Sequence, residues 1–293
     1  MRNTILALGC SYTDPNYRAY HSFIPADFPE HLKGGWKMWP EVFRDKLSER
    51  DGVEYKLINA GKSASGMDYQ ANEFFQHWVD YKNDLKIVLW GGTSWHRLYH
   101  ITNKQRYSIT DLADPKKPHI KKENYLNKRI ERMKADGMYE YAKSVALTLN
   151  SHEARKEIVR KYISMLVGIK DLCESNNVDF MFYQLLEPMT TSTFHTINED
   201  FIKEYSEYNA KFPINQINQL DLFRECKRAW KELCNSKYII GLNESSLISA
   251  WSTQYKKEKY TIADNDTYPN NDSHPNELGQ VHIGEIFWNH YTS

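Results

Sequence analysis

Residues 4–13, TILALGCSYT, decide the fold of this chain. The apolar run ends at Gly9 and is typical of a short buried strand in a parallel sheet. Ser11 follows the glycine in a tight turn, and we expect its hydroxyl above the edge of the sheet. If a helix begins there, its free N–H groups can also stabilise a negatively charged oxygen. Ser11 is therefore a candidate nucleophile, although a serine after a strand also commonly serves as a helix N-cap.

Outward from this strand, further apolar runs alternate with stretches of helical periodicity. Strands are predicted at 54–60, 86–90, 179–186 and 238–242. With the first strand these make five, and we expect Gly91 and Gly92 to end the strand at 86–90. Helices are predicted from near Trp39, Ala71, Ser151 and Pro275, with one more through Leu220, Phe223 and Leu233.

Strands that alternate with helices imply right-handed crossovers and a parallel sheet covered on both faces. The predicted fold class is α/β: a three-layer α/β/α sandwich around a flavodoxin-like, five-stranded parallel sheet with the strand order 2-1-3-4-5. In such sheets the functional site lies at the carboxyl ends of the strands. That rule selects the loops 9–14, 60–67 and 91–97, together with the loop before the last helix.

Two irregular regions interrupt this alternation, at about 97–150 and 188–236. We interpret residues 1–293 as a single domain with these two insertions, the first opening with a small hairpin over 97–109. Residues 116–134 within it are strongly basic. Such a stretch is most often the solvated face of a helix. The alternative is a lid or docking surface for an anionic polymer, such as an acidic glycan.

The composition excludes several classes of protein. The 293 residues include 38 Lys plus Arg and 38 Asp plus Glu, so the formal net charge is zero. A neutral chain does not fit a wholly basic nucleic-acid binder, and we expect no nucleic acid as partner. No apolar run approaches the ~20 residues of a membrane helix, and the run after Met1 is too short for a signal peptide. We expect a cytoplasmic or virion-associated protein without membrane contact.

Nothing in the sequence indicates a metal or cofactor. The cysteines are Cys10, Cys173, Cys226 and Cys234, and no two of them form a CxxC pair. Free thiols are the simplest interpretation for a chain of this length. His96 and His100 have a spacing used by metal ligands on helices, but this segment does not have a helical pattern and offers no clear third ligand. We therefore expect no metal site and no cofactor.

The loop before the last helix contains a second set of reactive residues. It reads NDSHPN over 271–276, so His274 lies two residues after Asp272. A histidine can accept the serine proton, while a carboxylate orients the imidazole and stabilises its charged form. Because both loops lie at the same edge of the sheet, the large separation of Ser11 and His274 in sequence is no objection. The predicted catalytic residues are Ser11, His274 and Asp272.

Three motifs in this order resemble the SGNH/GDSL hydrolase superfamily. They are GCSYT at 9–13, NAGKSASG at 59–66 and DSHPN at 272–276. The Trp39-Pro40 segment is also similar to bacterial and phage members, and the resemblance spans nearly the whole chain. It implies the SGNH hydrolase fold, with Ser11 as nucleophile, His274 as base and Asp272 as the residue that orients the base.

The chain departs from the family pattern where an oxyanion would be bound. The third motif of the family usually supplies an asparagine, but residues 90–97 read WGGTSWHR. Thr93 is the nearest positional match, followed by Ser94. The expected oxyanion hole comprises the N–H groups of Ser11 and of Ala64 or Gly66, together with Thr93. Losing one such donor typically lowers turnover by about 10²–10³.

Two smaller departures concern the nucleophile and its acid. The familiar Gly-Asp-Ser is Gly9-Cys10-Ser11 here, and the acid precedes His274 by two residues where three is commoner. Both departures leave the predicted triad in place. Side chains expected near the substrate are Tyr12, Ser94, Trp95 and Arg97.

The resemblance implies a serine esterase that hydrolyses a small acyl ester, such as an O-acetyl group on a carbohydrate. Its partner would then be a small-molecule or glycan ester. Two alternatives remain open. The chain could be an O-acyltransferase, in which a second hydroxyl takes the place of water. It could also be a weakly active or inactive module that binds a glycan or a protein, for example in a phage particle.

Overall fold

The computed structural model describes residues 2–15, 36–63, 65–93, 95, 99–101, 106–108, 131, 134–137, 139–141, 152–186, 239–240 and 274–293. The chain forms two compact units. The first comprises Met1–Ser94, Met165–Pro188 and Lys231–Ser293, and the second comprises Trp95–Ser164 and Met189–Trp230. The predicted insertions fall largely within the second unit, while the interpretation of the chain as a single domain stays a prediction.

The first unit contains a parallel sheet. Its strands are β1 (Thr4–Leu8), β2 (Lys56–Asn59), β3 (Leu85–Gly92), β6 (Asp179–Gln184) and β7 (Ile239–Ile240). They are arranged in the order β2-β1-β3-β6-β7, and every neighbouring pair is parallel. The predicted order 2-1-3-4-5 is confirmed. The described part of the fifth strand is shorter than the predicted 238–242.

The predicted end of the third strand is wrong. Gly91 and Gly92 do not end β3 but continue it, in register with Tyr183 and Gln184 of β6. The physical reason is space, because a Cβ on Gly92 would lie 2.4 Å from the Phe182 ring. Glycine is therefore used here for close packing within a strand, as its lack of a side chain permits.

The described helices lie where the periodicity predicts them, except that the helix predicted from Ala71 begins four residues earlier. They are α1 (Trp39–Asp51), α2 (Met67–Tyr81), α5 (His152–Ser175) and α11 (Glu277–Thr292). The helix predicted through Leu220 lies outside the described residues. In the second unit, β4 (Tyr99–Ile101) and β5 (Arg106–Ser108) form the antiparallel pair predicted as a hairpin.

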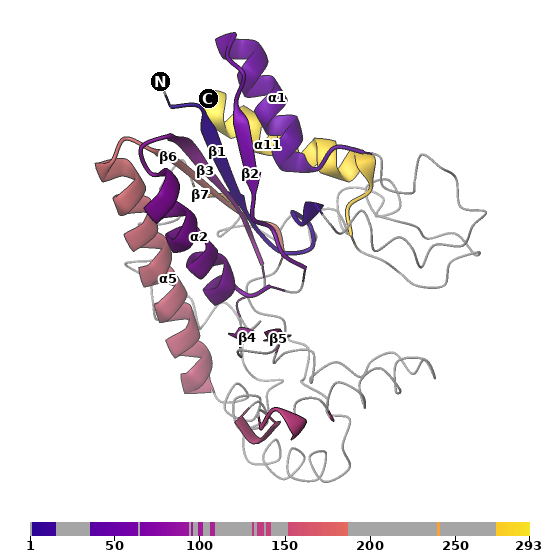
Figure 1. The fold of residues 1–293 in the computed structure, drawn as a ribbon, viewed down its shortest axis with the longest axis vertical. Coiled ribbons are helices and arrows are strands. Elements are labelled where there is room, and N and C mark those ends of the chain that lie inside the picture. The colour runs from indigo at the N-terminus through magenta and orange to yellow at the C-terminus, as the bar shows by residue number, and fades with distance from the viewer. Residues whose placement is uncertain are drawn as a thin grey trace, which may run out of the picture. The chain divides into compact units, whose positions relative to one another are not determined.

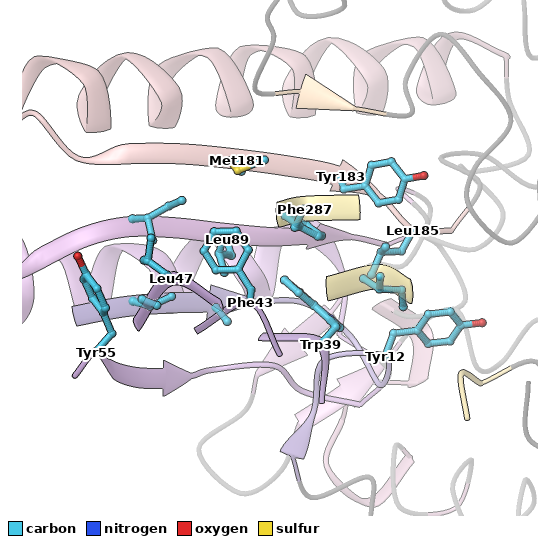
Figure 2. Packing of buried hydrophobic residues seen from close by; sticks show 14 of the residues in the cluster. Tyr12, Trp39, Phe43, Leu47, Tyr55, Leu89, Met181, Tyr183, Leu185 and Phe287 are labelled. Carbon is cyan, nitrogen blue, oxygen red and sulfur yellow. The ribbon is translucent and has the colours of Figure 1, made fainter. Parts of the chain in front are cut away.

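Helices cover both faces of the sheet, with α1 and α11 on one side and α2 on the other (Figure 1). On the first side, Ile5 and Leu89 belong to one buried apolar cluster with Trp39 and Phe287. The rings of Trp39 and Phe287 stack there at 4.3 Å, and Figure 2 shows this cluster from close by. Burial on both faces explains why β1 and β3 are almost continuously apolar.

The helices α1 and α11 touch at Gly284. A Cβ at this position would lie 2.8 Å from Val42 Cβ and 3.1 Å from the carbonyl oxygen of Trp39. Such distances leave no room for a methyl group. The close approach therefore depends on glycine in α11, and it brings the middle of α11 against the start of α1.

We expect Gly284→Ala to lower the free energy of unfolding by about 1–3 kcal/mol, because the added methyl overpacks this contact. Gly168→Ala is the matched control, since Gly168 is also inside a helix but has nothing within 4 Å of an added Cβ. It should raise the free energy of unfolding by about 0.5–1 kcal/mol through helix propensity. Urea unfolding of both variants measures this, and equal changes of the same sign would contradict the packing described.

Candidate active site

The turn after β1 has a defined hydrogen-bonded shape. The carbonyl oxygen of Cys10 accepts from the N–H groups of both Thr13 (2.9 Å) and Asp14 (3.0 Å). Gly9 is required before this turn, because a Cβ there would lie 2.0 Å from Thr13 Oγ1. The side chain of Cys10 is fully buried in the apolar cluster, as expected for a small core residue. Ser11, in contrast, directs its hydroxyl to a histidine.

Ser11 and His274 form a hydrogen-bonded pair. Ser11 Oγ lies 2.7 Å from His274 Nε2, although 263 positions separate the two residues in sequence. This distance permits proton transfer from a hydroxyl to an imidazole. Among the described residues, no backbone N–H donates to the Ser11 hydroxyl. The geometry therefore disfavours the interpretation of Ser11 as a helix cap.

The surroundings of His274 orient its ring. Tyr12 meets the imidazole edge to face, with the ring centroids 5.1 Å apart. Two residues further on, Asn276 caps α11, and its Oδ1 accepts from the N–H of Gly279 at 2.9 Å. A capped helix start is a rigid base for a side chain just before it. His274 is therefore placed by the start of α11 on one side and by Tyr12 on the other.

Three of the predicted oxyanion donors are described, and each is without an acceptor in the described part of the chain. The backbone N–H groups of Ser11 and Gly66 make no hydrogen bond there. The hydroxyl of Thr93 is buried with no hydrogen-bond partner. Gly66 is also the N-cap residue of α2, where helix geometry leaves N–H groups free. Unused donors of this kind suit a negatively charged oxygen.

Several predicted site residues are placed differently or not at all. Asp272, Ala64, Ser94 and Arg97 lie outside the described residues, so their roles stay predictions. Trp95 belongs to the second unit, is fully buried, and meets the ring of Tyr162 edge to face at 5.9 Å. Tyr12 is also buried, with 2 % of its surface exposed. Packing accounts for both rings, and their contact with substrate stays a prediction.

Residues at the end of β2 and in the loop after it form hydrogen bonds with the turn that carries Ser11. Asn59 donates from Nδ2 to the carbonyl oxygen of Thr13 (2.8 Å) and accepts at Oδ1 from Gly61 N–H (3.0 Å). Asp14 is fully buried and accepts from the N–H of Ser63 at 2.7 Å. The motif NAGKSASG predicts a functional loop here, but no sequence pattern indicates that Asn59 and Asp14 join it to the turn.

A chain of buried hydrogen bonds supports the turn from α2. The Trp90 indole N–H donates to Gln70 Oε1 (2.6 Å), and Gln70 Nε2 donates to Ser65 Oγ (3.0 Å). Ser65 then donates to the carbonyl oxygen of Gly9 at 3.1 Å. Gln70 is not predicted from the sequence, because an amphipathic helix pattern assigns polar residues to the solvent face. A buried glutamine with both amide groups paired is instead a structural connector.

We expect Gln70→Leu to lower the free energy of unfolding by about 1–3 kcal/mol, because it leaves the Trp90 indole N–H buried and unpaired. Trp90→Phe removes the same hydrogen bond from the other side. In the double variant, the second substitution should therefore lower the free energy of unfolding by less than it does alone, with a coupling energy of about 0.5–3 kcal/mol. A double-mutant cycle by urea unfolding measures this coupling, and strictly additive effects would contradict the connection.

The described part of the chain has neither a cluster of metal-ligating side chains nor a membrane-spanning helix. No three His, Cys, Asp or Glu side chains among the described residues gather as metal ligands would. Within the same residues, none of the helices combines the length and the apolar character needed to cross a bilayer.

No family model and no curated protein matches the chain. Two solved structures are similar over nearly its whole length. One is a lipolytic protein of the G-D-S-L family from Desulfitobacterium hafniense DCB-2, 12 % identical, covering 98 % of this chain and 99 % of that chain, with a TM-score of 0.35. The other is a catalytic mutant of an acetylxylan esterase from Geobacillus stearothermophilus, 10 % identical, covering 99 % and 96 %, with a TM-score of 0.42.

At TM-scores below 0.5, neither likeness assigns a family, an activity or a residue role to this chain. The contact between Ser11 and His274 is therefore the basis for assigning a function.

Proposed function

We propose that the chain is a serine ester hydrolase of the SGNH/GDSL type, with Ser11 as nucleophile and His274 as general base. The observation that supports this most strongly is the 2.7 Å contact between Ser11 Oγ and His274 Nε2. A free serine hydroxyl is a weak nucleophile at neutral pH, and a hydrogen-bonded imidazole is the usual means of activating it. The N–H groups of Ser11 and Gly66 and the hydroxyl of Thr93 have no acceptor in the described part of the chain. They are the donors that such a site needs for the negatively charged oxygen.

The reaction has two halves. In the first, Ser11 Oγ attacks the ester carbonyl carbon while His274 Nε2 takes the hydroxyl proton. The N–H groups of Ser11 and of Gly66 or Ala64, with the Thr93 hydroxyl, stabilise the negative charge that develops on the carbonyl oxygen. His274 then returns the proton to the leaving alcohol oxygen as the C–O bond breaks, which leaves an acyl group on Ser11.

In the second half, water attacks the acyl carbon and loses a proton to His274. The carboxylic acid departs, and His274 returns the proton to Ser11 Oγ. Asp272 would orient the imidazole and stabilise its charged form throughout. If a sugar hydroxyl replaced water in this step, the same residues would make the chain an O-acyltransferase.

The proposed substrate is a small acyl ester, such as an O-acetyl group on a carbohydrate. This choice follows from the family resemblance of the three motifs. The main competing function is a binding module without catalysis, suggested by the missing family asparagine. The buried, unpaired Thr93 hydroxyl favours hydrolysis, because a donor is retained at the corresponding position.

We expect Ser11→Ala to lower the hydrolysis of p-nitrophenyl acetate by at least ~10³-fold, because the nucleophile is lost. Ser48→Ala is the matched control. Ser48 lies near the far end of α1, where its hydroxyl accepts from the N–H of Tyr55, and this variant should keep the wild-type rate. Equal rates for Ser11→Ala and wild type would remove Ser11 from the mechanism, and a wild-type protein without activity would favour the binding module.

The role of the Thr93 hydroxyl as an oxyanion donor can be tested by replacing Thr93 with residues of similar size. We expect Thr93→Val to lower kcat by about 10²–10³ through the loss of one oxyanion donor, while Thr93→Ser keeps most of the activity. Stability should not fall in Thr93→Val, because the hydroxyl that it removes is buried and unpaired. Steady-state kinetics and urea unfolding measure the two effects. A wild-type kcat in Thr93→Val would exclude the hydroxyl from the oxyanion hole.

A further inference from the structure

We propose that Gln280 is the positioning residue that sets the distance between Ser11 and His274. It lies in the first turn of α11, where its N–H donates to the carbonyl oxygen of the N-cap residue Asn276 at 2.8 Å. His274 precedes that cap by two residues. Gln280 and His274 are therefore attached to the same capped helix start, so a displacement of one is transmitted to the other.

The side chain of Gln280 is buried, with 2 % of its surface exposed, and uses both ends of its amide. Nε2 donates to the carbonyl oxygen of Tyr12 at 3.2 Å, and Oε1 accepts from the backbone N–H of Trp39 at 2.9 Å. A carbonyl can only accept and an N–H can only donate, so these partners determine the orientation of the amide. The hydrogen bond to Tyr12 joins α11, which begins three residues after His274, to the residue that follows Ser11.

Trp39 extends the same connection to the next residue of the turn. Its indole N–H donates to Thr13 Oγ1 at 3.1 Å, while its backbone N–H is held by Gln280. Gln280 thus holds the turn directly at Tyr12 and through Trp39 at Thr13. These contacts form a closed ring between the serine turn, the start of α1 and the start of α11, which fixes all three elements at the site.

The amide of glutamine meets both requirements at neutral pH. Leucine at this position would remove both hydrogen bonds, the one from the Trp39 N–H and the one to the Tyr12 carbonyl oxygen. An ionised glutamate could accept from Trp39, but its second oxygen would repel the carbonyl oxygen of Tyr12. A protonated glutamate carries an O–H that can donate, and so resembles the amide. Gln280→Glu should therefore restore the connection as the pH falls and the carboxyl group takes up a proton.

The test compares Gln280→Leu and Gln280→Glu with Ile283→Ala. Ile283 lies one turn later on α11, is fully buried, and belongs to the apolar cluster. In crystal structures, Gln280→Leu should lengthen the Ser11 Oγ to His274 Nε2 distance from 2.7 Å to beyond hydrogen-bonding range, whereas Ile283→Ala should keep it. If Gln280→Leu does not fold, Gln280→Glu at neutral pH serves for the same comparison.

The kinetic consequence rests on the proposed function. We expect Gln280→Leu to lower kcat by about 10–10²-fold with little change in KM, because misplacement of reacting groups acts on the chemical step. For Gln280→Glu, the ratio of its kcat to that of wild type should rise as the pH falls. Ile283→Ala should lower the melting temperature but keep kcat at temperatures where it is folded.

The outcomes separate this inference from the proposed function. An unchanged Ser11–His274 distance in Gln280→Leu would overturn the positioning role, whether or not the protein hydrolyses esters. A wild-type kcat in Gln280→Leu, with Ser11→Ala inactive, would overturn it and leave the proposed function standing. An inactive wild-type protein would overturn the proposed function, while the crystal structures would still decide the role of Gln280.

Discussion

The hydrogen bond between Ser11 and His274 is the contact around which the first unit is organised. It joins the end of the first strand to the residues just before the last helix, so it forms only if the sheet and its covering helices are complete. The parallel strand order brings the loops after β1, β2 and β3 to one edge. The packing of α11 against α1, made possible by Gly284, brings His274 to the same place.

The core and the site are held by different forces. Apolar burial holds the sheet between its helices, but such burial is not directional and does not fix atoms to tenths of an ångström. Amide side chains provide the direction, because the half-buried Asn59 and the buried Gln70 and Gln280 each use both ends of the amide group. Within the described part of the first unit, the hydroxyls of Thr93 and Ser63 are the exceptions, because both are buried and left unpaired. An unpaired buried donor lowers stability, and a functional site is where one is expected to persist.

The sequence was sufficient for the sheet order and for the pairing of Ser11 with His274. Strands buried on both faces are continuously apolar, and right-handed crossovers leave few possible orders. The end of β3 was mispredicted because Gly91 and Gly92 serve close packing, whereas in sequence they look like a turn. Gln280 could not be foreseen either, because its partners are the backbone atoms of Tyr12 and Trp39, and any residue type offers such atoms.

Activation of Ser11 by His274 is measured most directly by covalent labelling with a fluorophosphonate probe, located by peptide mass spectrometry. A serine activated by a histidine attacks the phosphorus atom, displaces fluoride and retains the phosphonyl adduct. We expect a single rapid adduct on Ser11, and labelling that becomes far slower in His274→Ala. A folded wild-type protein that gains no adduct on Ser11, or equally rapid labelling of Ser11 when His274 is replaced, would contradict this activation.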